Sequence, residues 1–358
     1  MAGLYDVVVI GGTIAGLTSA LQLRRKGMRV VVLDPNSGNE SAVVGHGVAS
    51  PMGALTGVAE ERVPHNLGGY VAASGFVGWI AGRQAVDVQQ TGLVRRTMYE
   101  DREPVDARLR ASGAVLVGSF DQPLPGLTLR PGWRVEDALL VDPVTFVDAL
   151  VAEAKAWGVE IVHNAAVTRF RRNYGLHTVH YRSQLTWERT MFSVVAARVI
   201  DTMGVSPWGS QIGGASQAAP LVVARGLAID SVLVLPDAPA HVIRPWTDDQ
   251  VIVTGHSVSP PALETARVGL AHWLSDALGL TVSLRAGFGV QPTPEQDARS
   301  GASAIPGTFW ASGHGMWELT RGTASGLWLA ERLLHDPESP QRLGWGSRLR
   351  AKATRHEG

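Results

Sequence analysis

Residues 7 to 34 read in order as a strand, a glycine-rich turn, a helix and a second strand. Val7–Ile10 is apolar and β-branched throughout, as expected of a parallel strand buried on both faces. Gly11–Gly16 forms the turn, and an alanine- and leucine-rich segment suited to a helix follows it. Val30–Leu33 is a second buried strand, and it ends at Asp34. This order predicts a βαβ unit of a parallel sheet.

Each part of this unit has a physical role in binding a dinucleotide. Gly11 permits a tight turn after the first strand, and Gly16 permits close packing of the helix on the sheet. The amino end of the helix offers unpaired N–H groups and a positive dipole to a pyrophosphate. Asp34, about 20 residues later, can accept hydrogen bonds from a ribose. The predicted cofactor contacts in this unit are Gly11, Thr13, Ile14, Ala15, Gly16 and Asp34.

Thr13 departs from the usual fingerprint, because it stands where the middle glycine would bring backbone close to the pyrophosphate. Its hydroxyl could hydrogen-bond a phosphate, so we interpret the change as a variant of the motif. The alternative is a buried βαβ unit that binds no nucleotide.

Composition excludes several classes of protein. A chain of 358 residues exceeds what one core usually serves, so we expect two joined domains. The 32 Lys and Arg balance the 32 Asp and Glu, which gives no net field for nucleic acid or an acidic membrane. The absence of cysteine rules out disulfides, thiol nucleophiles and cysteinyl–flavin links, and we predict no metal site. With no secretory pattern and no membrane span visible, we expect a cytoplasmic enzyme.

Three later segments add to the first unit. Asp142-Pro143 opens an amphipathic helix, and Val194–Gly204 reads as a buried strand that ends in a glycine turn. Ala311–Thr320 is glycine-rich and precedes a predicted helix over Ala324–Leu334, whose first turn can offer N–H groups to a ligand. A nicotinamide enzyme would usually continue with regular alternation of strands and helices.

Taken in this order, the motifs resemble the D-amino-acid-oxidase (DAO) superfamily of FAD enzymes, in its glycine and sarcosine oxidase branch. The resemblance runs nearly end to end. It implies an α/β fold in which a Rossmann-like FAD-binding domain is interleaved with a mostly antiparallel substrate domain. Four segments with strand-like alternation between residues 205 and 300 agree with this. The expected bounds are 1–80, 140–215 and 295–345 for the FAD-binding domain, 81–139 and 216–294 for the substrate-binding domain, and 346–358 for a flexible tail.

The resemblance also implies further cofactor contacts. Gly313 and Gly315 would bring backbone beside the flavin, and Val167 would lie near the adenine. The other implied contacts are His46, Gly47, Val48, Gly204, Met316 and Trp317. Some relatives bond a histidine covalently to the flavin in the loop that contains His46. A packing role for His46 is the favoured alternative.

The substrate side is defined by a missing arginine. Relatives usually clamp the substrate carboxylate with an arginine before a proline, and the matching residue here is Gln291. An amide offers neutral hydrogen bonds in place of a charged fork. Arg244 and Arg321 are candidate substitutes for that arginine and, with Trp317, candidate catalytic residues. For either arginine, a surface or structural ion pair explains its presence as well as a ligand-binding role does. His241 is a further substrate-binding candidate, although a histidine on such a sheet more often has a structural role than a catalytic one.

The function that this resemblance implies is FAD-dependent oxidation of a C–N bond in an amine or amino-acid-like substrate, by hydride transfer that yields an imine. Because Gln291 replaces the arginine, a biosynthetic tailoring oxidase is one form of this hypothesis. The electron acceptor is O2 or another molecule, and no catalytic base is assigned. The alternatives are oxidation of a hydroxy acid or alcohol, a flavin monooxygenase, and a non-catalytic FAD-binding protein.

Overall fold

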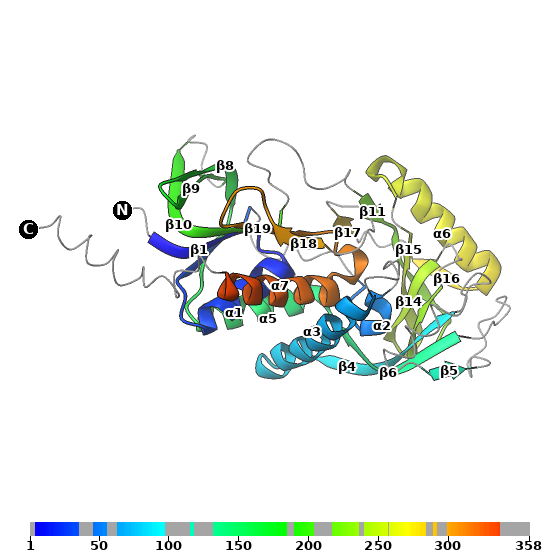
Figure 1. The fold of residues 1–358 in the computed structure, drawn as a ribbon. Helices are drawn as coiled ribbons and strands as arrows, with labels where there is room; N and C mark the ends of the chain where they lie inside the picture. Colours follow the sequence, from blue (N-terminus) through cyan, green and yellow to red (C-terminus); the bar gives the residue numbers. More distant parts are fainter. Residues whose placement is uncertain are drawn as a thin grey trace, which may run out of the picture.

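The computed structural model describes eleven stretches of the chain, and every structural statement below concerns these residues alone. They are 4–35, 46–55, 63–96, 115–117, 132–184, 190–203, 217–235, 240–256, 258–283, 289–291 and 299–336. Two large sheets stand at opposite ends of the molecule, with a group of helices packed against the first (Figure 1).

The first sheet contains the predicted βαβ unit. Its strands run in the order β18 (Arg299–Ala302), β19 (Thr308–Ser312), β10 (Met191–Asp201), β1 (Leu4–Ile10), β2 (Val30–Leu33) and β7 (Glu160–Val162). All neighbours are parallel except β18 and β19. Helix α1 (Ile14–Arg25) connects β1 to β2. The predicted strand, turn, helix and strand are therefore confirmed, and β1 lies in the interior of the sheet.

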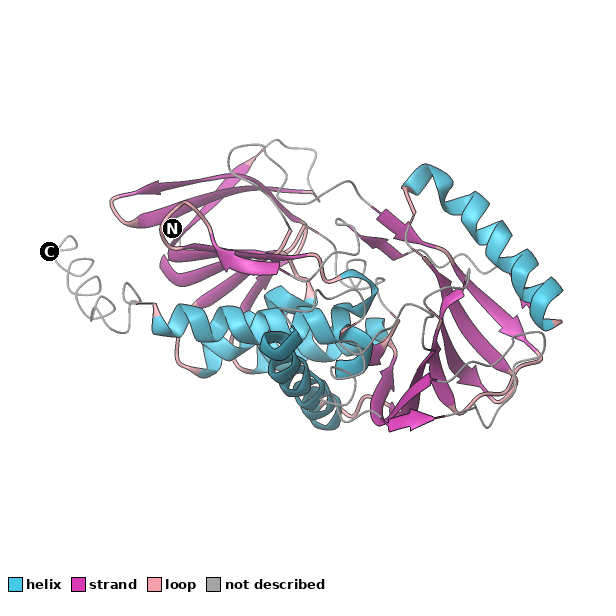
Figure 2. Ribbon diagram, turned by 45° about the vertical axis from the view of Figure 1, so that its right-hand side comes forward, coloured by secondary structure: helices cyan, strands magenta, loops and turns pink. Residues whose placement is uncertain are grey.

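Helices cover one face of this sheet, as Figure 2 shows. They are α1, α3 (Val63–Arg83), α5 (Pro143–Ala156) and α7 (Glu318–His335), and together with β1 and β2 they bury one apolar core. Asp142 begins α5 as predicted, since its carboxylate accepts the Thr145 N–H at 2.8 Å. On the other face, β8 (Ala165–Asn173) and β9 (Leu176–Ser183) continue from β10 around a second core. None of the described helices has the length and apolarity that a membrane crossing requires.

The second sheet is antiparallel except where β4 pairs with β13. Its strands run in the order β16 (Thr281–Ser283), β12 (Leu221–Arg225), β15 (Gln250–Gly255), β14 (Ala240–Thr247), β13 (Ser231–Val234), β4 (Val88–Arg96), β6 (Gly132–Val141) and β3 (Val48–Ala49), and β5 (Val115–Val117) pairs with β6. One face packs on α6 (Leu263–Leu278) and the other packs around Trp317. The predicted mixed fold with a mostly antiparallel second sheet is confirmed.

The remaining elements are short: α2 (Pro51–Ala54), the 3-10 turns η3 (Pro260–Ala262) and η4 (Gly315–Trp317), and a two-stranded sheet of β11 (Gln217–Ala219) and β17 (Gly289–Gln291).

Helix α7 is longer than the sequence predicted. It begins at Glu318, whereas the apolar pattern placed its start at Ala324. The early turns escaped the prediction because Thr320, Arg321 and Thr323 are polar and yet buried. Without apolar residues at helical spacing, the segment shows no amphipathic pattern. The amino end of α7 therefore lies directly after the Gly313–Gly315 turn.

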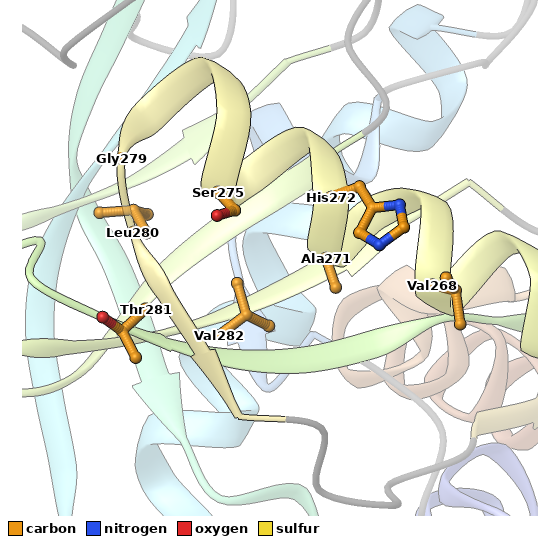
Figure 3. Close-up of a pocket in the computed structure, with 8 residues that line it drawn as sticks. All are labelled: Val268, Ala271, His272, Ser275, Gly279, Leu280, Thr281 and Val282. Carbon is orange, nitrogen blue, oxygen red and sulfur yellow. The ribbon is translucent and has the colours of Figure 1, made fainter.

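A surface hollow of about 640 Å³ lies beside α6 and the edge strand β16 (Figure 3). Its lining consists of Val268, Ala271, His272, Ser275, Gly279, Leu280, Thr281 and Val282. Since α6 covers the face of the second sheet that points away from Trp317, this hollow is separate from the site described next.

Candidate functional site

The turn between β1 and α1 is built around two glycines. Gly11 has φ +107°, and a Cβ there would lie 2.6 Å from Met203 Cγ. A Cβ on Gly16 would lie only 2.3 Å from the Gly11 carbonyl oxygen. Only glycine fits either position, so the chain turns tightly and the helix begins directly against the strand. The first-turn residues Ile14 and Ala15 are buried at this end of α1.

Thr13 caps α1. Its hydroxyl accepts the Gly16 N–H at 3.1 Å and donates to Thr202 Oγ1 at 2.8 Å, and Thr202 in turn donates to the Ile10 carbonyl. The single hydroxyl proton of Thr13 is therefore directed into the protein. This differs from the sequence-based suggestion of a phosphate contact: the threonine serves as an N-cap, a role for which its side chain is well suited.

We expect Thr13→Ala to lower the free energy of unfolding by about 1 kcal/mol, because it removes the cap of a buried helix. Thr13→Ser keeps the hydroxyl and serves as the matched control. Urea denaturation followed by circular dichroism measures both variants. An alanine variant as stable as the serine variant would contradict the capping role.

Asp34 lies at the end of β2, where the ribose contact was predicted. It is 3% exposed, and a Cβ on Gly12 would stand 2.6 Å from its carboxylate. His163 Nδ1 lies 3.5 Å from Asp34 Oδ2. The Asp34 carbonyl also accepts the Ala165 N–H at 2.7 Å, which brings the start of β8, and with it Val167, beside the acid. Gly204, the other contact predicted on this side, lies outside the described residues.

The glycine-rich segment before α7 turns sharply. Gly313 has φ +77° and Gly315 has φ +59°, a region of backbone conformation that favours glycine. Met316 and Trp317 follow in η4, and both are buried. The ring of Trp317 lies against Gly53 of α2, where a Cβ would stand 2.2 Å from ring carbon Cζ3. This tryptophan therefore joins the helical layer to the inner face of the second sheet.

His46 is held beneath Trp317. His46 is 1% exposed, and its ring Nδ1 lies 2.9 Å from Thr254 Oγ1 of β15. The backbone N–H of His46 donates to the Met316 carbonyl at 2.9 Å. The two rings meet edge to face with centroids 4.8 Å apart. Gly47 then turns at φ +68° into Val48, which pairs with β6. This geometry favours a packing role for His46.

Arg321 connects two helices. It is buried, and its Nε donates to the Ala54 carbonyl of α2 at 3.0 Å. Burial, together with the Arg321 charge, lowers the pKa of His314 to about 4, so this imidazole is neutral at pH 7. Arg321 therefore contacts protein backbone, which makes it a weaker candidate for a substrate clamp.

Arg244 is a buried cation on the inner face of the second sheet. It lies on β14 two residues after Val242, and so shares the sheet face that packs around Trp317. The side chain is 7% exposed, and its guanidinium lies 5.3 Å from the Trp246 ring centroid. Burial lowers the pKa of Arg244 to about 10, opposed by the Asp142 charge, so it remains protonated at pH 7. No carboxylate of the described residues forms an ion pair with it.

The two other substrate candidates are placed only by their strands. His241 lies in β14 and Gln291 in β17, where Gln291 pairs with Gln217 of β11. The side chains of both lie outside the described part of the structure.

Sequence reasoning missed three residues of the site: Gly53, His163 and Thr254. Each is brought in by a contact between segments far apart in the chain, such as the 208 residues that separate Thr254 from His46. No sequence motif around these residues predicts such a contact, although Gly53 lies only two residues beyond the glycine-rich loop at residues 45–51.

Comparison with known proteins agrees with this geometry. The family model described as FAD dependent oxidoreductase (DAO) matches residues 6–332. No curated protein sequence matches the chain. Among solved structures, glycine oxidase from Geobacillus kaustophilus superposes with a TM-score of 0.70 at 16% identity, over 92% of this chain and 94% of that one.

Two other similar structures are named for different activities. Iminodiacetate oxidase from Chelativorans sp. BNC1 gives a TM-score of 0.68 at 18% identity, covering 92% of this chain and 96% of that one. L-alpha-glycerophosphate oxidase from Mycoplasma pneumoniae, solved with FAD bound, gives 0.67 at 14% identity, covering 93% and 95%. At these identities the likeness shows the shared fold.

Proposed function

Since the chain belongs to the DAO family of FAD-dependent oxidoreductases, we propose that it oxidises a C–N bond in an amine or amino-acid-derived substrate and yields an imine. Bound FAD supplies the hydride acceptor. Similar structures named for glycine and iminodiacetate support a substrate that carries both nitrogen and carboxylate. Oxygen or another acceptor reoxidises the enzyme.

The described residues fit an FAD molecule. The amino end of α1 would receive the pyrophosphate, Asp34 the ribose, and the backbone of β8 near Val167 the adenine. At the other end, Gly313, Gly315, Met316 and Trp317 would lie along the flavin, with His46–Val48 beside them. In this proposal residues 1–80, 140–215 and 295–345 form the domain that carries FAD. Residues 81–139 and 216–294 form the domain that covers the substrate.

Arg244 is the observation that carries the substrate assignment. Arg244 forms no ion pair with a carboxylate of the described residues, and the Asp142 charge only partly offsets the effect of its burial. A substrate carboxylate would supply the missing charge and accept two parallel hydrogen bonds from the fork. Arg244 thus takes over the role that Gln291 cannot fill, from a different strand of the same domain.

The chain's own groups orient the substrate and exclude water. Trp317 and the inner face of the second sheet enclose the reacting carbon, and Arg244 fixes the carboxylate. No side-chain base is required if the amine arrives deprotonated. His314 is neutral and buried, and the His46 ring is hydrogen-bonded to Thr254. We therefore assign neither histidine to proton transfer from the substrate.

Anaerobic reduction of the holoenzyme, followed by loss of the flavin absorbance band, tests this function. Each amino acid is compared with its decarboxylated amine and with the corresponding hydroxy acid. Faster reduction by the amino acids is the expected result. Reduction by hydroxy acids alone would overturn the proposal in favour of alcohol oxidation, and reduction by NADPH alone would indicate a monooxygenase. No reduction by any substrate class would point to a non-catalytic FAD-binding protein.

Oxidation of a hydroxy compound is the second candidate, favoured by the similarity to L-alpha-glycerophosphate oxidase. Arg244 would serve that reaction equally well, because it would bind an anionic group of the substrate whether the neighbouring carbon carries an amine or a hydroxyl group. A larger amine, as in a tailoring reaction, is the form of the first candidate that Gln291 suggests. A panel in which only glycine and sarcosine react would contradict that form.

We expect acid precipitation of the holoenzyme to release free FAD into the supernatant, because the structure holds His46 by its ring and backbone against Thr254, Trp317 and Met316. Absorbance spectra of supernatant and pellet measure the outcome. If the wild-type pellet retained the flavin and the His46→Ala pellet did not, a covalent link at His46 would instead be established.

A further inference from the structure

The inner face of β14 leads from the core of the molecule to its surface. Val242 packs in the cluster that contains Trp317 and is 1% exposed, Arg244 is 7% exposed, and Trp246 is 50% exposed. Two residues along a strand span about 7 Å, so Arg244 lies one such step outward from Val242, and Trp246 lies two. Trp246 therefore stands at the outer end of a row that passes through Arg244.

The side chain of Trp246 is placed by its contact with Arg244. The pairing of β14 with β15 shifts between Pro245 and Thr247, so alternation along the strand does not by itself fix where Trp246 points. The guanidinium carbon of Arg244 lies over the indole ring, 5.3 Å from its centroid. Both side chains therefore lie on the same side of the sheet, and the indole covers the cation.

Half of Trp246 remains exposed, although the residue is large and apolar. Because Arg244 covers one side of the ring, the exposed surface lies on the sides of the indole that point away from the guanidinium. A single exposed apolar residue is ordinary in itself. This one adjoins a buried cation that forms no ion pair with a carboxylate of the described residues. The two residues thus offer a charged contact and an apolar contact side by side.

The acid whose charge acts on Arg244 is engaged elsewhere. Asp142 is that acid, and its carboxylate accepts hydrogen bonds from the backbone N–H and the hydroxyl of Thr145 at 2.8 and 2.9 Å. These bonds hold the Asp142 carboxylate at the start of α5. A carboxylate that binds Arg244 directly would have to come from a ligand or from outside the described residues.

We propose that Trp246 selects substrates with an aromatic side chain: Arg244 holds the carboxylate of the amino acid, and the exposed indole packs on its side-chain ring. This inference rests on the proposed function and names the class of amino acid within it. Aromatic rings pack at centroid distances of about 4.5–7 Å. A ring two carbons from a carboxylate can therefore reach the indole while the carboxylate contacts a guanidinium that lies 5.3 Å from the indole centroid.

The experiment compares how the holoenzyme binds two carboxylates that carry no amine, phenylpropanoate and propanoate. Isothermal titration calorimetry gives both dissociation constants, and their ratio isolates the contribution of the ring from that of the shared carboxylate. We expect the wild type to bind phenylpropanoate at least about tenfold more tightly, because the ring gains an aromatic contact and buries apolar area. In Trp246→Ala the ratio should fall to about twofold, whereas in Trp246→Phe it should stay within about threefold of the wild-type ratio.

Trp157→Ala is the matched control. Trp157 is also a partly exposed tryptophan beside an arginine, with the Arg25 guanidinium carbon 5.5 Å from its ring centroid, and it lies at the opposite end of α5 from Asp142. This variant should keep the wild-type ratio. Trp246→Gln gives a second non-aromatic variant, in case the alanine variant does not fold.

Three outcomes would overturn the inference. The wild type could bind both carboxylates alike, or Trp157→Ala could lose the ratio as fully as Trp246→Ala does. In the third outcome, Trp246→Ala and Trp246→Gln weaken both carboxylates equally and keep the ratio. Trp246 would then only shield Arg244 from water.

Anaerobic reduction of the flavin by phenylalanine and by alanine, each as both enantiomers, separates this inference from the proposed function. Faster reduction by phenylalanine in the wild type, with the preference lost in Trp246→Ala, would support both. Equal rates for the two amino acids in the wild type would overturn the aromatic class and leave amine oxidation intact. No reduction by any amine would overturn the proposed function, while the ratio of carboxylate dissociation constants would still decide whether Trp246 binds a ring.

Discussion

Arg244→Met is expected to raise the KM for a carboxylated substrate by about 100- to 1000-fold, and to leave the decarboxylated amine nearly unaffected. Removing one partner of a buried, hydrogen-bonded charge pair typically costs about 2–5 kcal/mol, and each tenfold change in affinity corresponds to about 1.4 kcal/mol. Methionine preserves much of the volume of the arginine stem, so β14 should stay packed between β13 and β15.

Two comparisons isolate the guanidinium. Arg244→Lys keeps the charge but loses the planar fork, so we expect an intermediate KM. Arg225→Met removes an exposed arginine from β12 of the same sheet and should leave KM unchanged. Steady-state kinetics on an amino acid and its decarboxylated analogue measure all three variants. If Arg244→Met slowed both substrates equally, Arg244 would be a structural residue and not the clamp.

The βαβ unit could be predicted because its determinants are local. Val7–Ile10 and Val30–Leu33 are apolar on both faces, and Gly11 and Gly16 allow a turn that no other residue fits. These properties belong to a continuous stretch of sequence, and the structure contains the strands and helix where they were expected. The left-handed conformations of Gly313 and Gly315 were not predicted, although the sequence marks the segment as glycine-rich.

The strands of the second sheet could be recognised, but their order could not. Alternating burial indicates a strand and its two faces without naming its neighbour. One of the four segments predicted as strands, residues 231–235, contains β13. The parallel pairing of β13 with β4, from a segment more than 130 residues earlier, follows from tertiary packing. The two-residue strand β3 joined this sheet from a loop that was expected to belong with FAD.

The contacts within the candidate site depend even more on tertiary structure. Trp317 packs on Gly53, and His46 forms a hydrogen bond with Thr254, because the helical layer and the second sheet meet at these residues. Neither residue of such a pair predicts the other. The first turns of α7 were predicted as part of a turn, because this segment lacks an apolar stripe. A polar helix start that becomes buried gives no periodic signal.

Gly16→Ala is expected to abolish tight FAD binding, with a dissociation constant at least about 100-fold higher. The added methyl group would stand 2.3 Å from the Gly11 carbonyl oxygen, 3.1 Å from Thr202 Oγ1 and 3.2 Å from Val9 Cγ1. Relief requires α1 to move away from β1, since Gly11 is fixed by its left-handed turn and β1 by both neighbouring strands. A displacement of about 1 Å at a positioning element can cost about 100-fold.

Gly27→Ala is the matched control, at the opposite end of the same helix. Gly27 has φ +85°, so alanine there is also strained, but its Cβ would meet nothing within 4 Å. We expect this variant to lose about 1–2 kcal/mol of stability and to keep the wild-type affinity for FAD. Equilibrium ultrafiltration at pH 7 measures the affinities. If Gly16→Ala bound FAD as tightly as Gly27→Ala does, the close approach of helix to strand would not be what places the pyrophosphate.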